Sequence, residues 1–241
     1  MKKIHSLLMI LPLLIACDSE TEIPVGLGQQ DTVASLNKIL DGPSPANISN
    51  VYDDAGILHN QLIDEYGLTG ILPSSVDSII GRVEALALNN SQITLKKTSA
   101  YAPLTVSRAN YLLTSGTGCL DEVMANTGLS PAVKGNFSDF ITSLITVCGT
   151  EPSYTTVLNF ITAYEAIVMT NLLITPQEKK LILTITSIVR HSAFYRRKPK
   201  RNTDIDWEFM ITHIVATVEG ASAGTAEAIT TSVAISIAEN L

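Results

Sequence analysis

The chain has 241 residues, a formal net charge of −7 at pH 7 and only 5% aromatic side chains. This balance argues against a nucleic-acid partner, because binding phosphates requires a basic surface and binding bases benefits from aromatic stacking. The length suits one large domain or two small ones, with enough chain to bury a hydrophobic core.

The N-terminal segment has the features of an export signal. Lys2 and Lys3 precede an apolar stretch over residues 7–15, and a small residue, Ala16, precedes Cys17. This order is typical of a signal peptide. The apolar stretch covers about nine residues, whereas a membrane-spanning helix needs roughly 20. We therefore expect residues 1–16 to be a signal peptide that is removed after export.

The end of this segment, Leu14-Ile15-Ala16-Cys17, resembles the lipobox of bacterial lipoproteins. The resemblance implies cleavage before Cys17, diacylation of its thiol and acylation of the new amino terminus. Several acyl chains anchor a protein firmly, whereas a single chain binds marginally. The expected partner is thus a membrane, held through the acyl chains of Cys17. The alternative is a secreted protein in which Cys17 is a free thiol.

Residues 17–30 are polar, contain Gly and Pro, and are expected to form a flexible tether. Residues 18–22 are acidic and resemble the signals that send lipoproteins of Bacteroidota to the cell surface. An aspartate directly after the cysteine also resembles the inner-membrane retention signal of enteric bacteria, and a tether without any signal is a further alternative. We expect a location in the bacterial cell envelope, at the outer membrane on its periplasmic face or at the cell surface.

Residues 31–241 are predicted to form one all-α domain, a single bundle of about seven or eight helices. Apolar residues recur at helical spacing, strand-like alternation is absent, and Ser130-Pro131 and Thr175-Pro176-Gln177-Glu178 are helix-start signals. A short extended piece is expected at 93–95. The candidate helical stretches, of which those at 31–40 and 104–113 are the weakest, cover approximately residues 31–40, 53–67, 75–88, 104–113, 119–126, 131–147, 153–170, 175–195 and 205–238.

Cys119 and Cys148 remain after removal of the signal and lipidation of Cys17. An exported protein lies in a compartment that permits disulfides, so we predict a Cys119–Cys148 bridge. Two buried free thiols are the alternative. A zinc site is not expected, because two cysteines this far apart, with no histidine nearby, lack the usual ligand spacing.

Polar and ionisable side chains are most concentrated in residues 52–60. This segment resembles a Tyr-Asp-x-x-Gly-x-x-His-Asn pattern found in uncharacterised lipoproteins of Bacteroidota. The resemblance implies no particular activity. The possible functional cluster consists of Asp53, Asp54, His59, Asn60 and Asp64. A histidine beside carboxylates could act as a general base or a metal ligand. The competing interpretation, which the sequence favours, makes His59 a core-edge residue and Asp53 a helix N-cap.

Metal, cofactor and catalytic motifs are absent from the sequence. His59, His191 and His213 show no metal-ligand spacing, and we find no nucleophile elbow, phosphate-binding glycine loop or calcium loop. No catalytic residue, cofactor or metal is therefore predicted. The sequence favours a non-catalytic protein, while an enzyme that uses His59 stays a competing hypothesis.

Two further segments bear on partners. Residues 196–201 include five basic residues, which could meet anionic lipid headgroups, polysaccharide or an acidic surface elsewhere on the domain. The alternative is a solvated turn with its positive charge at a helix C-terminus. Residues 211–238 are apolar and rich in small residues, and Gly220 and Gly224 would permit close helix packing. We expect this segment to pack in the core, with a possible kink at Gly220; a membrane-active helix is the alternative.

Together these features predict a lipid-anchored cell-envelope protein that acts as a binding or assembly component and meets an envelope protein or a glycan.

Overall fold

The structure is a computed structural model that describes residues 43–150, 152–195, 207–239 and 241. In this part of the chain every regular element is a helix, and eight helices are ten residues or longer, so the all-α prediction is confirmed. The signal peptide, Cys17, the tether, the helix predicted at 31–40 and the basic run at 196–201 lie outside the described residues.

Helices account for most of the described residues. In chain order they are α2 (Asp54–Leu68), α3 (Val76–Asn89), α4 (Ser91–Thr94), α5 (Val106–Ser115), the 3-10 turn η1 (Gly116–Cys119), α6 (Leu120–Ala125), α7 (Pro131–Cys148), α8 (Tyr154–Thr170), α9 (Pro176–Tyr195), α10 (Trp207–Ala223) and α11 (Thr225–Ala238).

The N-terminus of α9 shows how the local sequence determines where a helix begins. The Thr175 hydroxyl accepts the backbone N–H of Glu178 at 3.3 Å, and the Glu178 carboxylate accepts the backbone N–H of Thr175 at 2.9 Å. These two bonds form the predicted capping box. The same carboxylate also accepts the backbone N–H and the hydroxyl of Ser130, at 2.8 and 2.7 Å. The cap of α9 therefore also fixes the start of α7.

The prediction of an extended segment at residues 93–95 is wrong. Residues 91–94 form the single turn α4, because the Asn90 side chain accepts the backbone N–H groups of Gln92 and Ile93 and so caps a helical turn. Ile93 is fully buried in the core.

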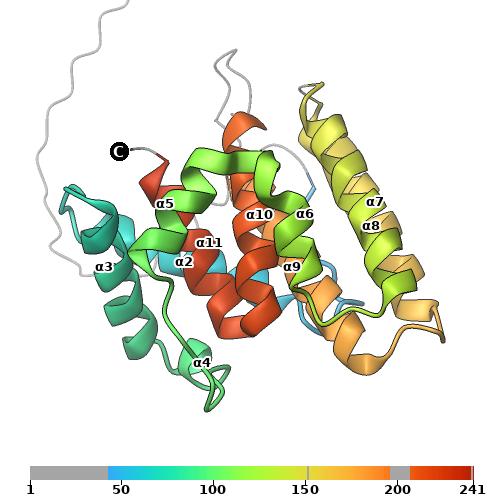
Figure 1. The fold of residues 1–241 in the computed structure, drawn as a ribbon, viewed down its shortest axis with the longest axis horizontal. Helices are drawn as coiled ribbons and strands as arrows, with labels where there is room; N and C mark the ends of the chain where they lie inside the picture. The colour runs from blue at the N-terminus through green and yellow to red at the C-terminus, as the bar shows by residue number, and fades with distance from the viewer. Residues whose placement is uncertain (1–42, 151, 196–206, 240) are drawn as a thin grey trace, which may run out of the picture. The chain divides into compact units, whose positions relative to one another are not determined.

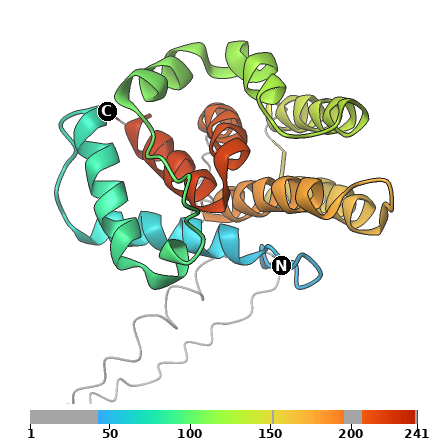
Figure 2. The same cartoon turned by 60° about the horizontal axis from the view of Figure 1, so that its bottom comes forward.

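The two C-terminal helices form the centre of the fold. Helices α10 and α11 pack on each other; α11 contacts α2, α3, α5 and α9, while α10 contacts α5, α6, α7 and α9. Figures 1 and 2 show both helices enclosed by the others. All residues of α11 except one are buried. The small-residue segment is thus core, as expected, and does not present a free apolar face.

The break between α10 and α11 lies at Gly224 rather than at the predicted Gly220. Gly220 serves instead as the point of closest contact between the two helices. A Cβ on Gly220 would lie 2.4 Å from the carbonyl oxygen of Glu227 and 2.7 Å from the Cα of Ala228. Only a glycine allows the two backbones to approach this closely.

The structure corrects the disulfide prediction, because both cysteines are buried free thiols. The Cys119 thiol donates to the carbonyl oxygen of Gly116 at 3.2 Å, and Cys148 ends α7 with no exposed surface. Burial raises the pKa of both thiols, that of Cys148 to about 12. A bridge requires converging Cβ atoms and Cα atoms within about 7 Å, which two cysteines in a sequence do not guarantee. Each thiol acts here as a small apolar core residue.

We expect both thiols to be unreactive in the folded protein, since burial and a raised pKa suppress the thiolate. N-ethylmaleimide should leave Cys119 and Cys148 unmodified under native conditions and should modify both in guanidinium without prior reduction. Peptide mass spectrometry measures each site separately. A need for reductant before modification would restore the disulfide.

Candidate functional site

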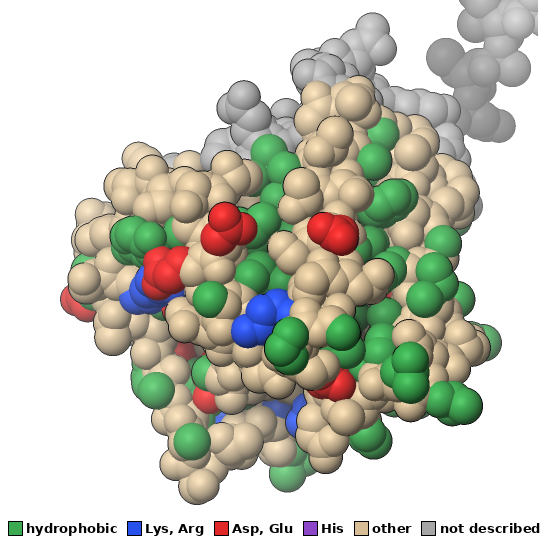
Figure 3. All heavy atoms as spheres, turned by 45° about the vertical axis from the view of Figure 1, so that its right-hand side comes forward, with side chains coloured by type: hydrophobic (Ala, Val, Ile, Leu, Met, Phe, Trp, Pro, Cys, Tyr) green, Lys and Arg blue, Asp and Glu red, His purple; other side chains and the backbone are tan. Residues whose placement is uncertain are grey.

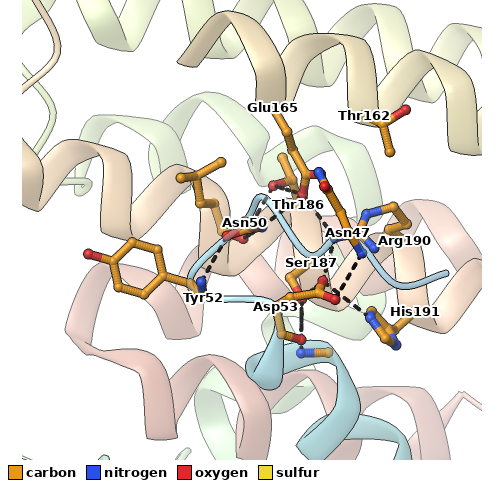
Figure 4. A network of polar contacts seen from close by, with 12 residues as sticks. Asn47, Asn50, Tyr52, Asp53, Thr162, Glu165, Thr186, Ser187, Arg190 and His191 are labelled. Atoms are coloured by element: carbon orange, nitrogen blue, oxygen red, sulfur yellow. Dashed lines mark hydrogen bonds and ion pairs between the residues drawn. The ribbon is translucent and has the colours of Figure 1, made fainter. Parts of the chain in front are cut away.

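The main polar feature of the described chain is a buried ionic network centred on Arg190, which lies in the middle of α9 and has no exposed surface. Its Nη2 atom donates to Asp53 Oδ1 at 2.5 Å and to Glu165 Oε1 at 3.2 Å. Figure 4 shows these side chains converging from α9, α8 and the loop before α2. One guanidinium thus serves two carboxylates that are distant in sequence.

Glu165 connects this network to the loop that precedes α2. Its carboxylate is fully buried on α8 and accepts the Nδ2 groups of Asn47 and Asn50 at 2.6 and 3.0 Å. It also accepts the Thr186 hydroxyl at 2.8 Å. The Asn50 amide donates in addition to the carbonyl oxygen of Leu183 at 3.0 Å. The hydrogen bonds compensate for the cost of burying a carboxylate.

Asp53 occupies the N-cap position of α2 but makes no side-chain cap bond, so its predicted role is corrected. Its carboxylate turns towards α9 instead, where it accepts Nη2 of Arg190 and the Ser187 hydroxyl at 3.1 Å and lies 3.3 Å from Nε2 of His191. Its second oxygen accepts the backbone N–H of Asn47 at 3.0 Å. Figure 4 shows this convergence.

The pKa of Asp53 depends on two opposing effects, burial of the carboxyl group and its contacts with His191 and Arg190. Burial by itself would raise the pKa of this carboxyl, but the His191 hydrogen bond and the Arg190 guanidinium outweigh it and lower the pKa from 3.8 to about 2. Asp53 is therefore ionised at neutral pH and is held as a structural anion, which is a poor general base.

This depressed pKa predicts a loss of stability in acid. The folded-state pKa lies below the unfolded value of about 3.9, so the contribution of Asp53 is present above about pH 4 and is lost as the pH falls towards 2. The loss should be about 2 kcal/mol. Glu178 adds to it in the same range, because hydrogen bonds from Ser130 and Thr175 lower its pKa to about 2. Urea unfolding between pH 6 and 2 measures the effect.

The matched control for this pH dependence is Asp53→Asn, which should lose less stability over the same pH interval than the wild type. An equal acid loss in both proteins would show that Asp53 does not titrate with folding.

Two members of the predicted polar cluster lie apart from the network. Asp54 pairs with Lys96 at 2.5 Å on the surface, and Asp64 accepts the Tyr195 hydroxyl at 2.5 Å. Neither carboxylate approaches His59 in a hydrogen bond. The predicted cluster of five residues is therefore not a single site.

The histidines come closer together than the sequence indicated. His59 is fully buried, its ring centroid lies 4.9 Å from that of His213, and its Nδ1 lies 2.9 Å from Asn60 Oδ1. Asn60 also donates to the carbonyl oxygen of His191 at 3.0 Å. Among the described residues, however, no group of three His, Cys, Asp or Glu side chains could hold a metal ion.

Sequence reasoning missed most of the network, namely Asn47, Asn50, Glu165, Thr186, Ser187 and Arg190. A usable signal was present in two of them. Glu165 and Arg190 each interrupt the apolar face of a strongly predicted helix, and a charge in such a face requires a partner when it is buried.

A pocket lies beside the charged network, but the network's charged groups do not line it. A neighbouring pocket of about 340 Å³ is lined by residues that flank the network in sequence, including Ser49, Tyr52 and Leu183, but not by its charged groups. The remaining walls come from the end of α8 and the start of α9. The pocket is thus mainly apolar.

Four exposed aliphatic side chains line this pocket or adjoin lining residues in the sequence: Val51 lines it, Ile48 precedes Ser49, and Leu172 and Leu173 precede Ile174. We call them the apolar rim: Ile48 (98% exposed), Val51 (78%), Leu172 (96%) and Leu173 (87%). The first two belong to the loop that the network holds, and the other two belong to the α8–α9 turn. Figure 3 views the side of the molecule where α7 and α8 lie and shows many hydrophobic side chains with few charged ones between them.

Comparison with known proteins gives no relative: no family model matches the chain, and no curated protein or solved structure matches it significantly. None of the helices in the described part of the chain has the length and hydropathy needed to cross a membrane.

Proposed function

We propose that this chain is a lipid-anchored protein of a bacterial cell envelope that binds a partner protein through the apolar rim and its pocket. The anchor is inferred from Leu14-Ile15-Ala16-Cys17 and places the domain beside a membrane. The binding role rests on one observation, the exposure of four large aliphatic side chains in the two segments, 48–51 and 172–174, that contribute to the wall of a pocket of about 340 Å³.

Such exposure favours a binding role on energetic grounds. Covering one leucine or isoleucine side chain contributes about 2 kcal/mol, so four of them supply a substantial part of a protein–protein association energy. Scattered single apolar residues need no explanation, but a group beside a pocket marks an interaction surface. The pocket offers a place for one apolar anchor side chain of the partner.

The chemistry of the rim favours a protein partner over a glycan. Its four members are aliphatic, and most residues of the pocket wall are apolar. The wall's one charged residue, Lys179, already donates from its Nζ to the carbonyl oxygen of Met169 at 2.8 Å. A hydroxyl-rich glycan would lose water from its polar groups here and would find few hydrogen-bond partners, because Ser49 and Lys179 are the only polar side chains besides Tyr52 in this wall. Apolar side chains of a protein carry no such cost.

The ionic network supports this role by ordering the loop. Asn47 and Asn50 each use their side-chain oxygen to accept a backbone N–H two residues later, at 3.2 and 2.9 Å, and their amide nitrogens donate to Glu165. Ile48 and Val51 lie next to these two anchors. The loop therefore needs little further ordering on binding, which improves affinity.

The anchor is tested by the intact mass of the protein purified from its native membrane. We expect the loss of residues 1–16 and a gain equal to the acyl chains. Cys17→Ser should abolish the gain and release the protein from the membrane. An unmodified Cys17 would refute the anchor.

The binding role is tested by photo-crosslinking in native cells, with a photoreactive residue at Leu172 or, as a matched control, at Leu88, an exposed leucine of α3 (66%). We expect one discrete crosslinked protein from position 172 and none from position 88, and Ile48→Asp should abolish the product while leaving stability within about 0.5 kcal/mol. Equal products from both positions, or no product from position 172, would contradict the proposal.

A further inference from the structure

The connection between α2 and α3 is an exposed apolar segment, residues 67–75, which we call the α2–α3 loop. Three of its side chains are large, aliphatic and exposed: Leu68 (86%), Ile71 (57%) and Leu72 (89%). No charged residue occurs between Glu65 and Asp77 in the sequence. Three such side chains within five consecutive residues are a group rather than scattered single residues, and a group of this kind marks an interaction surface.

The backbone of this loop is largely hydrogen-bonded within the protein. The N–H groups of Thr69 and Gly70 donate to carbonyl oxygens in the last turn of α2, at 3.2 and 3.1 Å. Those of Ser74 and Ser75 donate to a serine hydroxyl in the first turn of α3, at 3.4 and 3.2 Å, and Pro73 has no N–H group. The loop can therefore enter an apolar medium at a reduced cost, because few of its backbone donors would lose water without keeping a partner.

The α2–α3 loop and the apolar rim lie at opposite ends of α2. The loop 47–53, which carries two of the rim residues, precedes α2, and the α2–α3 loop follows it. The 15 residues of α2 separate them by roughly 22 Å, at a rise of about 1.5 Å per residue. Figures 1 and 2 both show the connection into α3 on the opposite side of the domain from α8. The two apolar surfaces can therefore be engaged at the same time.

We propose that the α2–α3 loop inserts into the lipid bilayer that holds the acyl chains of Cys17, so that the apolar rim points away from the membrane. This inference rests on the anchor proposed above. The chain between Cys17 and residue 43 can span at most roughly 90 Å, so an anchored domain stays within reach of the bilayer. At the high local concentration that results, even a weak contact forms.

The shape and charge of the loop favour a bilayer over a protein. Leu68 and Leu72 are almost fully exposed, so their side chains project from the surface and form no hollow that could receive a partner's side chain. A bilayer takes up projecting apolar side chains without a matching shape. The charges that flank the loop, those of Glu65, Asp77 and Arg82, are of both signs. Insertion therefore depends on burial of apolar surface and does not require anionic lipid.

The test places a photoreactive residue at Leu68, or at Leu172 (96% exposed) as a matched control, in native cells whose phospholipids carry radioactive phosphate. The acyl chains of the anchor contain no phosphate, so label on the protein reports a crosslinked phospholipid only. We expect at least about 10-fold more label from position 68 than from position 172, because only the α2–α3 loop enters the bilayer. Equal label from both positions, no label from position 68, or a discrete crosslinked protein from position 68 would overturn the proposal.

A charge substitution tests the contribution of the aliphatic side chains. Leu72→Asp, with the photoreactive residue at position 68, should lower the label at least about 5-fold, since an ionised carboxylate opposes insertion. Leu95→Asp, at an exposed leucine after α4 (85%), is the matched control and should leave the label unchanged. Both variants should melt within about 2 °C of the wild type, because both sites are exposed. Unchanged label in Leu72→Asp would contradict insertion of the loop.

The state of the anchor is measured independently, from the intact mass of the same protein without crosslinking. Label from position 68 on a chain whose Cys17 is unmodified would refute the anchor and retain the contact of the loop with lipid. Absence of label from position 68 would refute the contact of the loop with lipid, whatever the mass shows.

Discussion

Arg190→Met is expected to destabilise the fold by about 3–5 kcal/mol, the range for removing one partner of a buried ion pair. Arg190 has no exposed surface, and its loss deprives the carboxylates of Asp53 and Glu165 of the guanidinium that pairs with both. Methionine has a similar length, so the cavity that it leaves is small. The effect is therefore mainly electrostatic, and urea unfolding at pH 7 measures it.

A rescue experiment separates this electrostatic cost from a packing defect. Adding Asp53→Asn and Glu165→Gln to Arg190→Met removes the stranded charges and should recover a large part of the lost stability. Arg82→Met, which removes a half-exposed arginine bonded to Thr69, should cost less than about 1 kcal/mol. If Arg190→Met behaved like Arg82→Met, the network would contribute little to the fold.

Gly220→Ala is expected to cost about 3 kcal/mol, at the upper end of the range for overpacking a core. The added methyl would lie 2.4 Å from the carbonyl oxygen of Glu227, which is backbone and cannot move aside as a flexible side chain could. The two central helices must therefore separate, and this disturbs the packing of α11 against α2, α3 and α9.

The matched control is Gly81→Ala in α3, where an added Cβ would meet no atom within 4 Å. The same substitution there should stabilise the protein by about 0.5–1 kcal/mol, because alanine loses less conformational freedom in a helix. Opposite signs at the two positions would confirm the close contact of α10 and α11. A neutral result at Gly220 would show that the helices lie further apart.

The helices could be predicted where local chemistry specifies them. The capping box at Thr175 and the apolar spacing that follows it indicated α9 almost to the residue, and Ser153 marked the start of α8. Sequence reasoning failed at residues 93–95, where two β-branched residues suggested an extended segment but the Asn90 cap and burial of Ile93 produced a helical turn. The break at Gly224 was misplaced because Gly220 and Gly224 are equally good local candidates.

The site could be predicted only in part, because its contacts are long-range. Asp53 was identified from its polar neighbourhood, yet its partner Arg190 is 137 residues away in sequence. No local sequence pattern predicts which helix will pack against which loop in the folded protein. The same limit explains the cysteines, whose number permitted a bridge that their positions in the fold do not form.

The central claim is that the ionic network holds the loop 47–53 in one conformation and so presents the apolar rim. Hydrogen exchange of the Tyr52 and Asp53 amides, which donate to the side-chain and backbone oxygens of Asn50 at 2.9 and 3.0 Å, tests it most directly. We predict protection of at least about 100-fold in the wild type, and a clear loss in Asn47→Ala while the amides of α3 keep theirs. Exchange of both wild-type amides at the rate of an unstructured peptide would contradict the claim.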